Sequence, residues 1–161
     1  MANIDELKAA DGTLDAEAIM KIIPYGSNFL MVDKVTLLEK RRVQATKKSD
    51  LKQFEGHFRD FPLMPGALII EGLGQAATLL LRYNLPNHET KEILAYKIKE
   101  AKFSLPTFPG DELLFDVQMA GMDERGALMQ GSASVKGQKV SECTMMLSIV
   151  DRQQFRGRYA K

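Results

Sequence analysis

A histidine and a glutamate that can act together on a proton stand fourteen residues apart in the stretch EGHFRDFPLMPGALIIEGLGQAA, which runs from Glu55 to Ala77. The side chain of His57 titrates at about pH 6.5 in model peptides, so its neutral form can accept a proton at physiological pH. Glu71 interrupts an apolar run, and a carboxyl group held in an apolar pocket is a common general acid. The pair therefore indicates acid–base chemistry.

Each of the two residues also has a purely structural interpretation. An isolated histidine is often structural or exposed, although the Gly- and Pro-rich loop around His57 can hold its side chain at a fixed place. A lone Glu71 can lie on the solvent face of a helix. A solvated face normally carries more than one charge, however, and the next charge along this helix is Arg82. The second histidine, His88, stands in the polar segment NLPNHET and is expected to be solvated.

The helix that carries Glu71 is predicted to span residues 66–83. Pro65 suits its first position, because the N–H that proline lacks would be unbonded there in any case. No Ser, Thr, Asp or Asn precedes the helix to cap the amides of residues 66–68. Uncapped amides at the positive end of a helix can bind an oxyanion or a polarised carbonyl, and Gly66 has no side chain to block a ligand. The alternative is an ordinary helix start whose amides bind water.

Small residues are frequent inside the same helix. Gly72 and Gly74 each cost about 1 kcal/mol relative to alanine in a helix interior. We expect the helix to tolerate this cost because another element packs closely against its small residues.

The remaining segments predict an α+β fold. A short helix is expected in residues 14–24, and residues 53–65 and 84–90 are expected to be irregular. Strands are expected at residues 29–38, 41–49, 93–103, 111–122, 126–136 and 139–151. The later strands are joined by short connections, which implies antiparallel neighbours. The economical packing wraps this sheet around the long helix, and edge-to-edge pairing of two subunits would cover its open edges.

Length and composition restrict the class of protein. The 161 residues fit one domain over residues 1–161, with 1–13 as an extension or short helix and 152–161 as a tail that the sequence allows to be flexible. A formal charge of +1 favours no nucleic-acid partner. The single Cys143 and the lack of a secretory signal favour the cytoplasm. The most apolar run, residues 66–81, is short for a membrane span, and no cluster of ligands or phosphate loop indicates a metal or cofactor.

The central stretch resembles a known family. The pattern G-H-F-x-x-x-P-x-M-P-G, followed by a carboxylate and then x-x-x-Q, is similar to that of the (3R)-hydroxyacyl-[acyl-carrier-protein] dehydratases of the FabZ type. The matching residues are Gly56, His57, Phe58, Pro62, Met64, Pro65, Gly66, Glu71 and Gln75. Further likeness lies in FLMVDKV, AKFSLPTFPGDEL and VSECTMML, so the resemblance covers roughly residues 14–151.

The resemblance implies a hotdog fold, in which a curved antiparallel β-sheet wraps around one long central α-helix. It implies a homodimer, often assembled into a trimer of dimers, with each active site at the dimer interface. The implied reaction is dehydration of a (3R)-3-hydroxyacyl thioester to a trans-2-enoyl thioester in fatty acid biosynthesis, a hydro-lyase reaction that needs no cofactor. The substrate would arrive on acyl carrier protein as a 4'-phosphopantetheine-linked acyl chain.

The resemblance also implies a role for each site residue. His57 would remove the proton from C2, and the amide of Gly66 would hold the thioester carbonyl. Glu71, supplied by the other subunit, would orient or protonate the leaving hydroxyl. The remaining matched residues are expected to bind substrate: Phe58, Met64, Pro65 and Gln75. An acyl tunnel would be lined by apolar residues, each of which can equally be plain core: Phe54, Phe58, Leu68 and Ile69.

Basic residues offer three surfaces on which an acidic carrier protein can dock, although most charged faces are simply solvated. The first follows one strand, with Lys97, Lys99 and Lys102. The second is formed by Lys40, Arg41, Arg42, Lys47 and Lys48, and the third by Arg152, Arg156 and Arg158.

Several positions depart from the family pattern. Arg59 stands where proline usually follows His-Phe, PYGSNFLMVD lacks the usual histidine–arginine pair and second proline, and Gly72 and Gly74 replace residues that are commonly alanine or small apolar types. These departures leave acyl length and pathway open. The carboxylate is Glu rather than Asp, which favours a plain dehydratase over the related dehydratase–isomerase. The alternatives are a hotdog acyl thioesterase and a catalytically weak acyl-binding subunit of a specialised lipid pathway.

Overall fold

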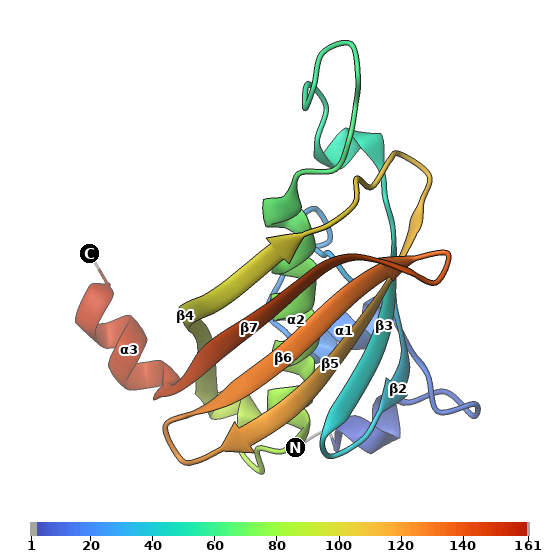
Figure 1. Cartoon of the computed structure of the whole chain (residues 1–161). Coiled ribbons are helices and arrows are strands. Elements are labelled where there is room, and N and C mark those ends of the chain that lie inside the picture. The colour runs from blue at the N-terminus through green and yellow to red at the C-terminus, as the bar shows by residue number, and fades with distance from the viewer. Residues whose placement is uncertain (1–2, 161) are drawn as a thin grey trace.

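The computed structural model describes residues 3–160, in which one antiparallel sheet curves around helix α2 (Figure 1). Its strands pair in the order β1-β2-β3-β5-β6-β7-β4. The strands are β1 (Leu14–Asp15), β2 (Lys34–Leu38), β3 (Arg42–Lys48), β4 (Lys91–Phe103), β5 (Glu112–Met122), β6 (Gly126–Val135) and β7 (Gln138–Asp151). The helices are α1 (Ala16–Ile22), α2 (Gly66–Tyr83) and α3 (Arg152–Tyr159), with 3₁₀ turns η1 (Ile4–Leu7), η2 (Leu51–Gln53) and η3 (His88–Thr90). The expected α+β architecture is confirmed.

The concave face of the sheet is apolar because alternate side chains of its strands point toward α2. Phe115 and Val117 on β5 are buried against the helix layer, while Asp116 between them is on the other face and partly exposed. Gly72 lets the helix approach, since a Cβ there would lie 2.3 Å from the ring of Phe115. The close packing expected around the helical glycines is therefore confirmed at Gly72. It does not extend to Gly74, whose nearest such neighbour is Met145 Sδ at 4.0 Å.

The strand expected over residues 29–38 begins only at Lys34. Of the preceding apolar residues, Leu30, Met31 and Val32 are buried while Phe29 is exposed, and part of this backbone is bound to a helix side chain instead of a neighbouring strand. Met31 N donates to Gln75 Oε1 over 2.8 Å, and Gln75 Nε2 donates to the carbonyl of Phe29 over 3.0 Å. The apolar pattern thus predicted most of the burial correctly and the backbone conformation wrongly.

Both ends of the described chain carry short capped elements. In η1 the side chain of Asn3 accepts from Asp5 N, and Ile4 is buried in the core. The segment 152–161, which the sequence allows to be flexible, contains α3, whose first turn is capped by Asp151 accepting from Gln154 N over 3.0 Å. Residues 1, 2 and 161 lie outside the described range.

Strand β4 forms an open edge of the sheet (Figure 1). Its first residues are partly or fully buried, but every residue from Ala95 to Phe103 is exposed. Tyr96 is 72% exposed and Ile98 is 51% exposed. A long edge with exposed apolar side chains is a template for pairing with another strand. In a single copy, this template has no partner.

Between residues 3 and 160, no helix combines the length and the apolar character that a membrane span requires. The long helix α2 is interrupted by a glutamate, a glutamine and an arginine, and its apolar residues face the sheet.

Candidate active site

The loop that joins β3 to α2 carries His57 and projects beyond the end of the sheet (Figure 1). His57 is half-buried, and its Nδ1 lies 2.9 Å from the carbonyl oxygen of Leu63. A carbonyl can only accept, so Nδ1 carries the proton in this contact and Nε2 is left with a free lone pair. A backbone hydrogen bond joins the same two residues, since Leu63 N donates to the carbonyl of His57 over 2.8 Å. The loop therefore directs Nδ1 toward Leu63 and leaves Nε2, which is the acceptor of the neutral ring in this tautomer, without a partner within residues 3–160.

Aromatic side chains surround this imidazole on the projecting loop. The ring of Phe58 stacks on His57 with centroids 4.3 Å apart, and the peptide bond between the two residues is cis. Phe58 is 56% exposed and Phe61 is 61% exposed, so the apolar side of the loop faces outward. Arg59 is exposed between them. Phe61 also packs edge-on against Phe108, with centroids 5.6 Å apart, so the loop carries a half-buried imidazole beside two largely exposed aromatic rings.

Glu71 lies on α2, about one and a half turns from the start of the helix. It is half-buried, and its Oε1 accepts from Gln75 Nε2 over 3.0 Å. Gln75 is fully buried and its amide is also engaged by the segment before β2. The amide of Gln75 therefore fixes the carboxylate and leaves Oε2 of Glu71 uncommitted. This arrangement supports a positioning role for Gln75 rather than the direct substrate contact that the sequence suggested.

The start of α2 has the uncapped geometry expected from the sequence. Pro65 occupies the N-cap position, one residue before the predicted place, and no side chain caps the helix. Leu68 N donates back to the carbonyl of Pro65 over 3.0 Å, whereas no acceptor within residues 3–160 meets the amides of Gly66 and Ala67. These amides lie at the positive end of the helix, where a developing negative charge is stabilised.

A groove of about 590 Å³ opens beside these amides. It is lined by Leu63, Met64, Gly66, Ala67, Ile69, Phe103, Ser104, Leu105, Pro106 and Thr107. The space left by the missing side chain of Gly66 is filled by Phe103, whose ring would lie 2.4 Å from a Cβ at that position. The expectation that Gly66 leaves room for a ligand therefore needs amendment, because Phe103 uses that room. Neither Phe103 nor Thr107 was selected from the sequence, although both lie in AKFSLPTFPGDEL.

His57 and Glu71 are not joined within one chain. Among residues 3–160, no hydrogen bond or ion pair connects them, and the loop of His57 extends away from the helix that carries Glu71 (Figure 1). The apolar candidates for an acyl tunnel differ in how far they are exposed. Phe54 and Ile69 are buried in the core, whereas Phe58 is exposed.

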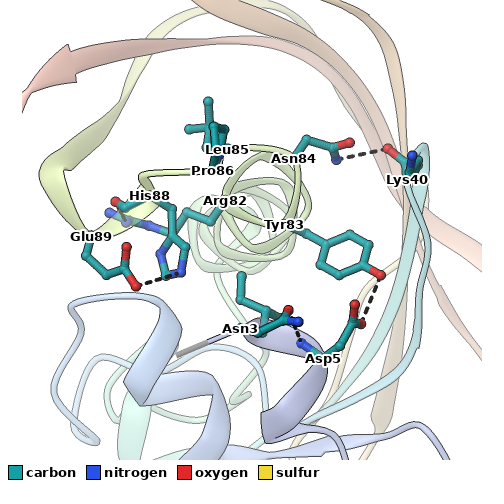
Figure 2. A pocket seen from close by; sticks show the side chains of 11 residues that line it. Asn3, Asp5, Lys40, Arg82, Tyr83, Asn84, Leu85, Pro86, His88 and Glu89 are labelled. Carbon is teal, nitrogen blue, oxygen red and sulfur yellow. Dashed lines mark hydrogen bonds and ion pairs between the residues drawn. The ribbon is translucent and has the colours of Figure 1, made fainter. Parts of the chain in front are cut away.

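The opposite end of α2 also holds a cavity, of about 540 Å³, which lies away from these residues (Figure 2). His88 lines it and is only 8% exposed, so the expectation of a solvated His88 is wrong. Arg82 is fully buried beside it and donates from Nη1 to the carbonyl of His88 over 2.5 Å. Burial lowers the pKa of His88, and the nearby carboxylate of Glu89 opposes this shift. The polar neighbours of His88 in sequence give no sign of this anchoring.

Several of the basic residues proposed for docking are already paired. Lys47 binds Asp33, Arg42 binds Asp116, Lys102 binds Glu100, and Arg152 and Arg156 both bind Glu92. Lys97 and Lys99, on the exposed part of β4, have no ion pair within residues 3–160. In the same part of the chain, no group of three or more His, Cys, Asp and Glu side chains is arranged to hold a metal ion.

The fold and the sequence both place this chain among known proteins. Residues 23–144 match the family model of the FabA-like domain. The dehydratase heterocomplex ApeI:P from Xenorhabdus doucetiae superposes with a TM-score of 0.70 at 13% identity, covering 89% of this chain and 97% of that one. The fluoroacetyl-CoA thioesterase FlK gives a TM-score of 0.64 at 13% identity, covering 73% of this chain and 90% of that one. At these identities the likeness shows the fold alone, which is the hotdog fold expected from the sequence.

Curated relatives narrow the class. The 3-hydroxyacyl-[acyl-carrier-protein] dehydratase FabZ of Anaeromyxobacter dehalogenans is 39% identical over 147 residues, which are 87% of this chain and 93% of that protein. The FabZ of Solibacter usitatus is 34% identical over 143 residues, 88% of each chain. The chain therefore belongs to the FabZ family of hotdog dehydratases.

Proposed function

We propose that this protein dehydrates (3R)-3-hydroxyacyl-acyl carrier protein to the trans-2-enoyl product in fatty acid biosynthesis. The observation that carries the proposal is the presence of three groups: an imidazole whose Nε2 is free, a carboxyl group fixed through one oxygen, and two unbonded helix amides. Dehydration of a thioester needs a base, an acid and an oxyanion partner. The FabZ relatives, which match most of the chain, support the same reaction.

The chemistry divides among these groups as follows. Nε2 of His57 takes the proton from C2, and the electron pair moves toward the thioester oxygen, where the amides of Gly66 and Ala67 stabilise the charge. The electron pair then returns to form the C2–C3 double bond as the bond between C3 and its hydroxyl breaks. Glu71, acting in its carboxylic acid form, donates a proton through Oε2 to the departing hydroxyl, which leaves as water. Proton exchange with solvent returns both groups to their starting states.

The proposal requires two copies of the chain. The loop that carries His57 projects beyond the end of the sheet, and β4 offers an open apolar edge (Figure 1). Pairing two β4 strands would join two sheets and cover Tyr96 and Ile98. His57 from one subunit would then meet Glu71 of the partner subunit. Further association into a trimer of dimers is part of the same proposal.

Acyl carrier protein is the proposed partner, presenting its acyl chain on a 4'-phosphopantetheine arm. Lys97 and Lys99 are positively charged and form no ion pair within residues 3–160. Such unpaired charges suit the electrostatic steering of an acidic protein during association. We place the reaction in the cytoplasm, in keeping with the single, buried and unpaired Cys143.

The test is an assay in the hydration direction with crotonyl and longer enoyl thioesters. We expect loss of the enoyl-thioester absorbance without release of free thiol. Thiol release would instead identify a thioesterase, and tight acyl binding without turnover at any chain length would identify an acyl-binding subunit. Graded chain lengths on acyl carrier protein would then define the preferred substrate.

A further inference from the structure

The groove at the start of α2 contains a polar group that the proposed mechanism does not use. Most of its lining is apolar, from Leu63 to Pro106. The lining has two polar side chains, an exposed Ser104 and a buried Thr107. Thr107 is the one shielded from solvent. It is 1% exposed, and its Oγ1 is shielded from solvent without any hydrogen-bond partner within residues 3–160. An unpartnered buried hydroxyl is unfavourable, because the group has lost its bonds to water and gained none.

The position of Thr107 relative to the helix start is fixed by the backbone. Its carbonyl accepts from Met64 N over 2.8 Å, and Met64 precedes Gly66 by two residues. Thr107 and Gly66 therefore line the same groove, with Phe103 packed on Gly66 between the strand end and the helix. Besides the exposed Ser104, three hydrogen-bonding groups without a partner within residues 3–160 share this wall: the amides of Gly66 and Ala67, and the hydroxyl of Thr107.

We propose that Thr107 is a substrate-binding residue whose hydroxyl hydrogen-bonds an amide of the arm that carries the thioester. This proposal rests on the proposed function. An apolar groove with a few placed polar groups is typical of a ligand site. The helix amides only donate, which suits the thioester oxygen, whereas a hydroxyl both donates and accepts, which suits an amide. One rotation about χ1 exchanges the hydroxyl and the methyl of threonine, so the hydroxyl turns toward the arm when it enters.

The hydroxyl is tested by an isosteric change. Thr107→Val removes the hydroxyl and keeps the shape, and Thr107→Ser keeps the hydroxyl. Thr36→Val, at an exposed position of β2 near the far edge of the sheet, is the matched control for a threonine outside the groove. Each protein is assayed for hydration of three crotonyl thioesters: pantetheine with two amides, N-acetylcysteamine with one, and ethanethiol with none.

We expect Thr107→Val to raise KM for crotonyl-pantetheine about three- to tenfold, the range of one neutral hydrogen bond, with little change in kcat. The ratio of mutant to wild-type KM should fall toward one on the ethanethiol ester. Thr107→Ser should keep most of the affinity, and the melting temperature of Thr107→Val should not fall below that of the wild type, because an unpartnered hydroxyl has been removed.

Two results would overturn the inference while leaving the proposed function intact. One is an equal KM for wild type and Thr107→Val on all three thioesters. The other is the same increase on all three, with a lower melting temperature, which would show that the hydroxyl serves the fold. If the wild-type protein hydrates none of the thioesters, the proposed function fails and this inference fails with it.

Discussion

Gln75 and Glu71 are joined one helical turn apart on α2, with Gln75 Nε2 donating to Glu71 Oε1 over 3.0 Å. The other contacts of the same amide reach Met31 N and the carbonyl of Phe29. One buried side chain therefore ties the proposed catalytic carboxylate to the segment that leads into β2. The orientation of Glu71 is set by the fold and does not depend on a bound substrate.

Replacing Gln75 with leucine should weaken both functions of this amide. We expect kcat to fall by about tenfold or more with KM little changed, because Glu71 loses its orientation but remains present. The free energy of unfolding should fall by about 1–3 kcal/mol, since Met31 N and the Phe29 carbonyl lose their partner. Steady-state kinetics and urea unfolding measure the two effects. An unchanged kcat would remove Gln75 from the site.

Mixed dimers test whether each site takes residues from two chains. His57→Ala and Glu71→Gln alone should each lose about 10²–10⁴-fold in kcat. In a mixed dimer, one of the two sites keeps both His57 and Glu71. Random mixing of the two variants should therefore restore about a quarter of wild-type activity, as expected for a two-fold interface. Failure to recover any activity from verified mixed dimers would show that both residues act within one chain.

Gly72 and Gly74 offer a matched pair for the packing of α2. Gly72→Ala places a Cβ against the buried ring of Phe115, and overpacking of this kind costs about 1–3 kcal/mol, of which the better helix propensity of alanine offsets about 1. Gly74→Ala meets only an ordinary contact and should be neutral or stabilising. Chemical denaturation compares the two. Equal stability would mean that the close approach at Gly72 is not needed.

His88 should make stability depend on pH. Its folded pKa lies below the usual value because burial disfavours the charged ring, and Arg82 and Arg152 add to this effect while Glu89 opposes it. The unfolded state therefore binds more protons as the pH falls below about 6.5, and the free energy of unfolding decreases there. At higher pH both states are neutral and the contribution is complete. His88→Asn should flatten this slope between about pH 7 and 5, as followed by thermal melts. An unchanged slope would assign the pH dependence to other groups.

The sequence predicted the elements that have strong local signals. The sequence was sufficient to predict the apolar length of α2, its uncapped start and the short turns between β5, β6 and β7. The family motif identified His57 and Glu71 as candidates. Contacts between residues far apart in the sequence could not be predicted. Met31 and Phe29 bind Gln75, more than forty positions away, through their backbone, although the apolar pattern of residues 29–32 resembled that of a strand. His88 is buried where Arg82 binds its carbonyl oxygen. The residues next to His88 in the sequence do not indicate this contact.

A single copy of this polypeptide is prone to aggregate because the edge of β4 is unpaired. A newly synthesised copy displays unpaired backbone groups beside Tyr96 and Ile98, the combination through which unrelated strands join into aggregates. The proposed pairing with a second copy would compete with that outcome, so the yield of soluble protein should depend on how quickly two copies associate during synthesis. Replacing Tyr96 or Ile98 with lysine would then suppress both aggregation and the proposed pairing of two β4 strands.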